Sequence, residues 1–330
     1  GTICSLITAR EDKTNFKSND EGIQNNRFKI YCSKEAHSSV EKAVRAIGIG
    51  SNNLKKINTN SNLSMNFVEL EKQIKKDLKN NFTPLAIIST FGTTGTVAFD
   101  SLKDIGKIAK KYKIWHHIDA AYAGVILFLK KYRHNAKYIK NADSFVFNPH
   151  KWMLTNFDCS LYFAKDKEKL IRALEIHPEY LKSEESKINN YKDWSLQLGR
   201  RFRALKLWFV IRSYGLKGIK KYIKNHITLA KYLHKKILKN KNFELTTELN
   251  VNMINFRLNP KFKNLSNEEL NSLNKKLIKN LNKTGKIYLS HTIINSIYSI
   301  RMPIASTTIN KTNIEKSWEL IKNISNDIIK

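Results

Sequence analysis

Short runs of β-branched and aromatic residues alternate along the first part of the chain with stretches whose apolar residues recur every three or four positions. The short runs predict strands, and the longer stretches predict amphipathic helices. This alternation indicates an α/β fold in which a sheet is flanked by helices on both faces. The predicted strands are Phe28–Cys32, Leu85–Thr90, Ile114–Ile118, Ser144–Phe147 and Leu161–Ala164, and the predicted helices are Ser38–Ile47, Phe67–Asn80, Leu102–Tyr112 and Glu168–Leu174.

Local signals support several of these elements. The run PLAIIST, residues 84–90, is apolar at consecutive positions, which is typical of a strand buried on both faces. Ser101 is a candidate N-cap for the helix that begins at Leu102. Ser38 begins a capping-box pattern with Glu41, which predicts a helix start at that point.

The pattern of apolar and charged residues along the chain changes after about Gly215. Long lysine-rich amphipathic stretches predict helices, and weaker apolar runs between them predict strands. We therefore expect two domains, a large one over residues 1–215 and a smaller α+β domain over residues 216–330. The helices expected in the second domain are Leu216–Leu238, Glu268–Lys283 and Ile314–Ile329, the last behind a cap at Thr312 or Asn313, and the strands are Val251–Leu258 and Tyr298–Met302.

The first residues predict a helix that has no start signal. Ile3, Leu6 and Ile7 share one face of the stretch Thr2–Arg10, but no capping residue or entry loop precedes it. We therefore expect the chain to begin inside an element and to lack an N-terminal part.

The charge of the chain suggests a polyanionic partner at first sight. Among 330 residues, 59 Lys and Arg stand against 28 Asp and Glu, a formal net charge of +31. Such an excess can indicate a nucleic-acid or anionic membrane surface. The lysines are spread over most predicted helices, however, and occur together with abundant Asn and Ile. We favour compositional drift on a solvated surface, and expect neither a nucleic-acid nor a membrane partner.

Cysteine use and hydropathy bear on the compartment. The three cysteines, Cys4, Cys32 and Cys159, include no C-x-x-C pair, so neither a disulfide framework nor a zinc ribbon is indicated. No apolar run approaches the roughly 20 residues of a bilayer-spanning helix, and no signal-peptide pattern opens the chain. We expect a cytoplasmic protein.

The segment NPHKW, residues 148–152, is the first candidate for chemistry. It follows an apolar strand, and ligands of open α/β sheets bind outside the carboxyl ends of strands. Lys151 has Phe147, Pro149 and Trp152 around it, and their apolar side chains would shift the amine toward its neutral, nucleophilic form. Such an amine suits Schiff-base chemistry with an aldehyde cofactor. The alternative is an ordinary solvated lysine after a strand.

The segment HHIDAAYAG, residues 116–124, is the second candidate. It places Asp119 at a strand end and small residues after it, which leave room for a flat molecule. A pyridoxal phosphate ring needs a carboxylate facing its nitrogen, and Asp119 could fill that role. The alternative is a turn or helix-capping aspartate. A metal site formed by His117 and Asp119 is disfavoured because no further cluster of ligands lies nearby in the sequence.

Two further strand ends carry candidate residues. His37 lies where the first predicted strand gives way to a helix, and an imidazole there could stack on a cofactor ring. The segment TFGTTGT, residues 90–96, combines Gly and Thr in a way that permits close approach of backbone to a ligand. It does not match G-x-G-x-x-G and does not imply a dinucleotide.

Together these segments resemble the group II pyridoxal-phosphate-dependent decarboxylases, and most of all the aromatic L-amino-acid decarboxylases. The resemblance runs with few gaps from Thr2 to the C-terminal segment RMPIASTT. It implies an aspartate aminotransferase-like large domain, a homodimer, and decarboxylation of an aromatic L-amino acid to its amine and CO₂. It is carried by AHSSVEKA, TFGTTGTVAFD, HHIDAAYAG, ADSFVFNPHKWMLTNFDCS and LGRRFRALKLWFVIRSYGLKG.

The resemblance also implies roles for single residues. Lys151 matches the lysine that carries pyridoxal phosphate, Asp119 the carboxylate on the ring nitrogen, and His37 the histidine that stacks on the ring. Other matches are Thr94 and Ala121, which line the ring, and Asn148 and His150, which lie near the phosphate.

The segment HPEYLK, residues 177–182, resembles the mobile catalytic loop of this family. Tyr180 matches its tyrosine, which helps to deliver a proton to the substrate α-carbon after CO₂ leaves. Relatives that form aldehydes tend to replace this tyrosine by Phe or the stacking histidine by Asn. Tyr180 and His37 are both present here, which favours simple decarboxylation.

The sequence also departs from the family pattern. The Ser/Thr-rich turn that holds the phosphate, and the N-terminal segment that swaps across the homodimer, would both precede Thr2 and are absent from this sequence. The hypothesis that follows is weak cofactor binding by the chain as given, since a helix N-terminus is a strong phosphate site. The alternatives left open are an aldehyde synthase, a decarboxylase of another amino acid, and a non-catalytic truncated remnant.

Overall fold

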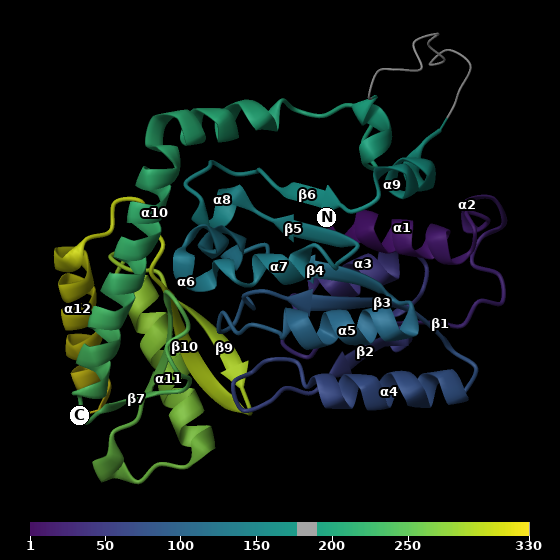
Figure 1. Cartoon of the computed structure of the whole chain (residues 1–330). Helices are drawn as coiled ribbons and strands as arrows, with labels where there is room; N and C mark the ends of the chain where they lie inside the picture. Colours follow the sequence, from purple (N-terminus) through teal and green to yellow (C-terminus); the bar gives the residue numbers. More distant parts are fainter. Residues whose placement is uncertain (177–189, 330) are drawn as a thin grey trace. The chain divides into compact units, whose positions relative to one another are not determined.

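The computed structural model describes residues 1–176 and 190–329 (Figure 1). The chain forms two compact units. The first contains residues 1–93 and 99–213, and the second contains residues 94–98 and 214–330. No helix within the described ranges is both long and apolar enough to cross a lipid bilayer.

A six-stranded sheet organises the first unit, in the order β2-β1-β3-β4-β5-β6. The first five strands in the chain run parallel, and β6 is antiparallel to β5. The sheet is therefore mainly parallel, and the predicted α/β fold is confirmed. The strands are β1 (Phe28–Ser33), β2 (Leu54–Ile57), β3 (Thr83–Thr90), β4 (Trp115–Asp119), β5 (Ser144–Phe147) and β6 (Leu161–Ala164).

Helices cover both faces of this sheet, because side chains alternate across a strand. Ile30 and Cys32 of β1 pack with α1 (Thr2–Lys13) and α3 (Ser39–Ala46). Tyr31, between them, packs on the other face with α4 (Phe67–Lys79) and α5 (Leu102–Tyr112). The remaining elements of this unit are α2 (Ser18–Glu21), η1 (Ser51–Asn53), η2 (Ala123–Phe128), α6 (Lys130–Arg133), α7 (Ala136–Ile139), α8 (Pro149–Trp152), α9 (Lys167–Leu174) and η4 (Tyr191–Trp194).

The predicted helix starts had mixed outcomes. The Ser101 hydroxyl accepts the backbone N–H of Asp104 at 3.3 Å, which confirms the predicted cap of α5. The capping box predicted for Ser38 is wrong, because its side chain makes no capping hydrogen bond and its backbone is already helical. The last helix begins at Lys311, earlier than predicted, and Asn310 caps it by accepting the N–H of Asn313 at 2.9 Å.

Helix α10 (Arg203–Leu238) is longer than the sequence predicted. The prediction began at Leu216, whereas helical structure begins at Arg203 and is interrupted at Gly215, where φ is 58°. A positive φ costs glycine little, so the interruption falls where the chain can tolerate it. The residues before Tyr214 belong to the first unit and those from Tyr214 onward to the second.

The second unit is a smaller α+β structure. Its four-stranded antiparallel sheet has the order β7-β8-β10-β9, and α10, α11 and α12 contribute to its apolar core. Trp318 of α12 packs against Phe243 of β7 with ring centroids 5.0 Å apart. The elements are β7 (Phe243–Leu245), β8 (Met253–Leu258), η5 (Lys261–Lys263), α11 (Asn267–Lys283), β9 (Ser290–Ile294), β10 (Ile297–Pro303) and α12 (Lys311–Ile329).

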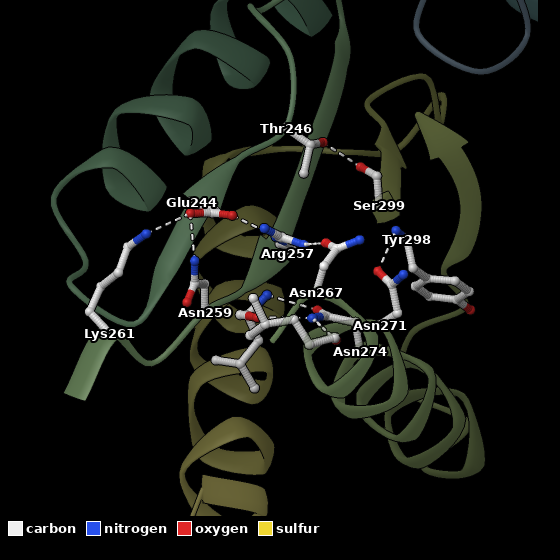
Figure 2. A network of polar contacts seen from close by, with 12 residues as sticks. Glu244, Thr246, Arg257, Asn259, Lys261, Asn267, Asn271, Asn274, Tyr298 and Ser299 are labelled. Atoms are coloured by element: carbon white, nitrogen blue, oxygen red, sulfur yellow. Dashed lines mark hydrogen bonds and ion pairs between the residues drawn. The ribbon is translucent and has the colours of Figure 1, made fainter. Parts of the chain in front are cut away.

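A polar network holds one edge of this second sheet (Figure 2). Glu244 of β7 accepts hydrogen bonds from Arg257 Nε at 2.5 Å, Asn259 Nδ2 at 2.7 Å and Lys261 Nζ at 2.9 Å. Arg257 donates in turn to Asn267 Oδ1 at 2.7 Å. Both oxygens of the carboxylate are thus used, which offsets its partial removal from water.

Asparagines on one face of α11 extend the same network (Figure 2). Asn274 accepts the N–H of Leu258 at 2.7 Å and donates to its carbonyl at 2.9 Å, so it acts as a neighbouring strand for β8. Asn271 accepts the N–H of Tyr298 at 2.7 Å. Residues spaced by three or four positions share a helix face, and the sequence spacing of Asn267, Asn271 and Asn274 therefore fixes α11 on the sheet.

Candidate active site

The candidate site lies where three neighbouring strands of the first sheet end. Thr90 at the end of β3 pairs with Asp119 at the end of β4, and Asp119 pairs with Val146 of β5. The chain stays joined beyond these pairs, because Phe91 N donates to Asp119 O at 2.8 Å and Ala120 N donates to Val146 O at 2.9 Å. The loops that carry the predicted residues therefore leave the sheet from one edge, as an open α/β sheet requires of a ligand site.

Asp119 is held as a buried carboxylate at this edge. Its residue is only 6% exposed, and Oδ1 accepts the backbone N–H of Ala121 at 3.0 Å. That hydrogen bond fixes the carboxylate over the turn that follows β4. A turn aspartate of this kind matches the structural alternative, but the other carboxylate oxygen accepts no hydrogen bond from the residues that the structure describes, so it can accept one from a ligand.

Lys151 has the electrostatic environment expected of a nucleophilic amine. Removal of water by the surrounding protein lowers its pKa, and the negative charge of Asp119 partly opposes that shift. The two side chains are therefore near enough to interact through space. By the accessible surface of the whole residue Lys151 is exposed, as a group that must meet a cofactor has to be.

The turn that carries Lys151 is tied directly to the Asp119 loop. Asn148 N donates to the carbonyl of Ala121 at 3.0 Å, and Lys151 N donates to the carbonyl of Asn148 at 2.9 Å. The Asn148 side chain is fixed as well, since Ser160 Oγ donates to its Oδ1 at 2.7 Å. Three predicted residues, Ala121, Asn148 and Lys151, thus belong to one hydrogen-bonded cluster.

Stacking of two aromatic side chains also joins the two segments of this cluster. Trp152, 2% exposed, stacks on Tyr122 with ring centroids 5.4 Å apart and an interplanar angle of 14°. Tyr122 lies in the Asp119 loop and Trp152 in α8, so the stacking joins the same two segments as the backbone hydrogen bonds. A buried aromatic pair of this kind contributes about 0.5–1.5 kcal/mol beyond its burial.

Two glycines allow the backbones at this edge to come close together. A Cβ placed on Gly124 would lie 2.5 Å from Cβ of Phe147. A Cβ on Gly92, where φ is 98°, would lie 2.4 Å from Cβ of Ala123. Both distances are far below van der Waals contact, so the glycines of TFGTTGT and DAAYAG are required by packing.

His37 lies beyond the end of β1 and is exposed. Its Nδ1 accepts the backbone N–H of Ser39 at 3.2 Å and lies 2.8 Å from Ser39 Oγ. Because Nδ1 is used as an acceptor, a neutral ring carries its proton on Nε2. The hydrogen bonds orient the ring but lead to Ser39, and they do not join it to Asp119 or Lys151.

His150 is held by the loop that follows α8. Its Nδ1 accepts the backbone N–H of Cys159 at 3.0 Å, and its ring meets Phe157 edge-on with centroids 4.9 Å apart. These contacts fix the residue that precedes Lys151. The role near a phosphate stays a prediction.

Thr94 belongs to the second unit, together with the rest of residues 94–98. Arg301 of β10 donates to the carbonyls of Thr94 and Gly95, and Asn255 of β8 donates to that of Gly95 at 3.1 Å. Sequence reasoning missed Arg301 and Asn255 as anchors of this loop. The only signal was the place of Arg301 in the segment RMPIASTT. Tyr180 lies outside the described residues.

The two histidines of β4 are engaged inside the protein. His117 Nδ1 lies 2.8 Å from Ser144 Oγ, and its Nε2 lies 3.4 Å from Thr2 Oγ1. Burial lowers the pKa of His117 to about 3 and that of His116 to about 4. His117 therefore has a structural partner at each nitrogen, and no group of His, Cys, Asp and Glu within the described ranges could hold a metal ion.

The chemistry of these residues fits a pyridoxal cofactor. The site combines an amine of lowered pKa with a buried carboxylate whose free oxygen can face a ring nitrogen. Lys151 and Asp119 would hold the two ends of such a ring. A mainly parallel α/β sheet with this pair at its carboxyl edge is an arrangement that suits an aldehyde cofactor bound to lysine.

Comparison with known proteins identifies the family. Residues 1–259 match the conserved domain of pyridoxal-dependent decarboxylases. The chain therefore belongs to the pyridoxal-dependent decarboxylase family. The fold agrees, since a crystal structure of *Oryza sativa* TDC with PLP and tryptamine aligns with a TM-score of 0.94 at 29% identity, covering 100% of this chain and 69% of that one.

Two relatives show the range of names in this family. Tyrosine decarboxylase 4 of *Petroselinum crispum* is 38% identical over 97% of this chain. Phenylacetaldehyde synthase of *Arabidopsis thaliana* is 38% identical over 89% of it. The chain spans 64% of the length of the first relative and 60% of the second, which is less than two thirds of each.

Proposed function

We propose that this protein removes the α-carboxyl group of an aromatic L-amino acid, giving the amine and CO₂, with pyridoxal phosphate as cofactor. The observation that carries the proposal is the pairing of Lys151, whose pKa is lowered by burial, with the buried carboxylate of Asp119. The names of relatives support the substrate class, since one is a tyrosine decarboxylase and one aligned structure contains tryptamine.

Each residue of the site would have a role that follows from its position. Pyridoxal phosphate, when bound, would supply an electron sink for the electron pair that stays on the α-carbon when CO₂ departs. Lys151 would hold the cofactor through Nζ, and Asp119 would keep the ring nitrogen protonated, because a carboxylate beside a nitrogen base favours its charged form. His37, which can carry its proton on Nε2, would cover the face of the ring.

The other predicted residues would complete the pocket. Tyr180 would deliver a proton to the substrate α-carbon after CO₂ leaves. Ala121 would border the ring, and Asn148 and His150 would lie toward the phosphate. The hydrogen bond from Asn148 N to the carbonyl of Ala121 supports a shared pocket for two of these residues.

An aldehyde synthase is the second candidate function. One relative of 38% identity is named a phenylacetaldehyde synthase, so the family name alone does not settle the product. The presence of both Tyr180 and His37 favours the amine. The non-catalytic alternative is disfavoured because Lys151, Asp119, His37 and Tyr180 are all present.

The proposal includes a homodimer in the cytoplasm. Apolar side chains in and beside the first part of α10 are exposed, with Phe202 at 75%, Phe209 at 55% and Trp208 at 53%. An exposed apolar surface of this kind is typical of a protein interface. The three cysteines are free, which suits a reducing compartment. Residues 1–215 would bind the cofactor and residues 216–330 would form the small domain.

Product analysis tests this proposal. The purified protein is incubated with pyridoxal phosphate and L-tyrosine, L-tryptophan or L-phenylalanine, and amine, aldehyde, CO₂ and hydrogen peroxide are measured. We expect the amine and CO₂ in equal amounts from at least one substrate. Lys151→Ala should lower turnover by about a thousandfold or more, whereas Lys140→Ala, which removes an exposed lysine, should not. Aldehyde with peroxide would instead assign an aldehyde synthase, and no product from any substrate would contradict the proposal.

A further inference from the structure

A cavity of about 580 Å³ lies in the first unit. It is found at the end of the strands that is opposite to the end where Lys151 lies. Its walls include Lys13 of α1, Gly106 of α5, Trp115 and Asp143. Trp115 begins β4 and Asp119 ends it, so the cavity and the candidate active site lie at opposite ends of one strand. The volume falls within the range of roughly 300–1,000 Å³ that is usual for small-molecule sites.

The rim of this cavity is strongly basic. Of the two carboxylates that line it, Asp12 is already paired with Lys169 at 2.7 Å, and Asp143 Oδ2 accepts the backbone N–H of His116 at 2.8 Å. The lining lysines are Lys13, Lys103, Lys107, Lys110, Lys113 and Lys165. Within residues 1–176 and 190–329, none of these six forms an ion pair. The lining therefore carries a local excess of positive charge, although Lys165 lies near enough to Asp143 to act on its carboxylate.

His116 contributes a buried polar atom to the lining. Its residue is 1% exposed, and Nε2 lies 2.8 Å from Ser89 Oγ. Its Nδ1, by contrast, has no hydrogen-bond partner in the described part of the chain. An unsatisfied buried polar atom is costly. A ligand that reaches Nδ1 would remove this cost.

Gly106 lies beside this nitrogen, which is itself shielded from water in the structure. A Cβ at position 106 would stand 3.9 Å from both Nδ1 and Cε1 of His116. Gly106 lies inside α5, where alanine is the better helix former by about 1 kcal/mol. No positive φ requires glycine at this position, and a Cβ there would come into contact with the His116 ring alone.

We propose that this cavity binds a small phosphate monoester that carries a flat ring, of the kind found in nucleoside monophosphates. The lysine rim would bind the phosphate, and the ring would lie against the apolar part of the lining, which includes Trp115 and Tyr138. When the Ser89 hydroxyl donates to Nε2 of His116, Nδ1 carries the proton and donates to a ligand oxygen. This site is independent of the cofactor chemistry at Lys151.

An adjoining hollow has a volume of about 440 Å³ and shares Trp115, Asp143 and Lys165 with the cavity. It adds Asp166, Lys167 and Lys169, but Lys167 pairs with Glu168 at 3.5 Å and Lys169 with Asp12 at 2.7 Å. The cations for the phosphate are therefore the six lysines of the cavity itself. A phosphate bound by several lysines and one buried donor is a charge-assisted arrangement.

Isothermal titration with adenosine monophosphate tests the proposal. The protein is first saturated with pyridoxal phosphate, so that the cofactor site does not contribute, and the titration is run at physiological ionic strength. We expect saturable binding at one site, and weaker binding of inorganic phosphate, which lacks the ring.

Matched variants locate the site. Gly106→Ala should weaken binding about fivefold or more, because the new methyl group covers Nδ1 of His116, while thermal stability is kept or raised. Lys110→Gln should also weaken binding about fivefold. Lys111→Gln is the control, since Lys111 lies on the same helix but pairs with Glu71 at 2.7 Å outside the cavity.

Three outcomes would overturn the proposal. One is the absence of saturable binding. Another is equal weakening by Lys110→Gln and Lys111→Gln, which would mean diffuse attraction to a basic helix. The third is tighter binding of a single-stranded oligonucleotide than of adenosine monophosphate, with Gly106→Ala having no effect. That result would assign the charge to a polynucleotide surface.

Discussion

The backbone N–H of Asn148 donates to the carbonyl of Ala121 at 3.0 Å, and this single hydrogen bond joins the turn that carries Lys151 to the loop that follows Asp119. The stacking of Tyr122 on Trp152 joins the same two segments through their side chains. The amine and the carboxylate are therefore positioned by one rigid unit. Sites held on rigid elements keep reacting groups in a productive geometry.

Close packing between the two segments gives the first prediction. Gly124→Ala should destabilise the protein by about 1–3 kcal/mol, because its Cβ would lie 2.5 Å from Cβ of Phe147 and the segments would have to separate. The affinity for pyridoxal phosphate should fall as well. Urea unfolding and cofactor titration measure the two effects. Gly199→Ala is the control, since nothing lies within 4 Å of a Cβ at that position; equal stability of the two variants would contradict the packing argument.

The carboxylate of Asp119 gives the second prediction. Asn can still accept the N–H of Ala121 through its amide oxygen, so Asp119→Asn should keep the turn. It should lose the negative charge beside the ring nitrogen and lower kcat by about a hundredfold or more. Steady-state kinetics with the amine as product measure this loss, and circular dichroism checks the fold. A variant with near-normal kcat would show that Asp119 is only a turn residue.

The network around Glu244 gives a prediction about pH. Burial acts to raise the pKa of Glu244, but hydrogen bonds from Lys261, Arg257 and Asn259 outweigh it, and the pKa is lowered. A lowered pKa in the folded state means stability that is present above the unfolded pKa of about 4.3. This stability is lost as the pH falls through the folded value.

Glu244→Gln should therefore cost about 1–2 kcal/mol at pH 7, between the values typical of exposed and buried ion pairs. The difference from the wild type should shrink toward pH 3. Urea unfolding at both pH values measures it, with Glu248→Gln, at an exposed position, as the control. A difference that stays constant between pH 7 and pH 3 would show that the charge of Glu244 is not involved.

The loop tyrosine gives a prediction about the product. Tyr180→Phe removes the hydroxyl that would protonate the substrate α-carbon, so turnover should shift from the amine toward aldehyde, ammonia and hydrogen peroxide. Quantifying amine and peroxide per substrate consumed measures the shift. Tyr191→Phe, at an exposed tyrosine, should leave the product unchanged. An unaltered amine yield in the Tyr180 variant would remove this residue from the mechanism.

The elements that the sequence predicted well carry strong local signals. The apolar run of β3 and the capped, amphipathic α5 were found nearly to the residue. Strand β2, which reads LKKI, was missed because only its two ends are buried and a four-residue edge strand leaves little periodicity. The first part of α10 was missed, and its apolar residues, such as Trp208 and Phe209, are exposed in the structure and not part of a core.

Some residues of the candidate site could likewise be predicted from the sequence, and others could not. Asp119 and Lys151 could be predicted because each directly follows an apolar strand, and parallel strands end at a common edge. The anchors of the Thr94–Gly95 segment could not be predicted, since Asn255 and Arg301 lie 160 and 206 positions from Gly95 in the chain. Contacts over such separations depend on tertiary packing. Local sequence patterns do not report them.

Covalent trapping of the cofactor tests the central claim most directly. The protein is incubated with pyridoxal phosphate, reduced with borohydride and digested, and the modified peptide is sequenced by mass spectrometry. We expect a pyridoxyl group on Lys151, an amine whose pKa is lowered by its surroundings, and on no other lysine in stoichiometric amount. Attachment at a different lysine, or no attachment with the cofactor in excess, would contradict it.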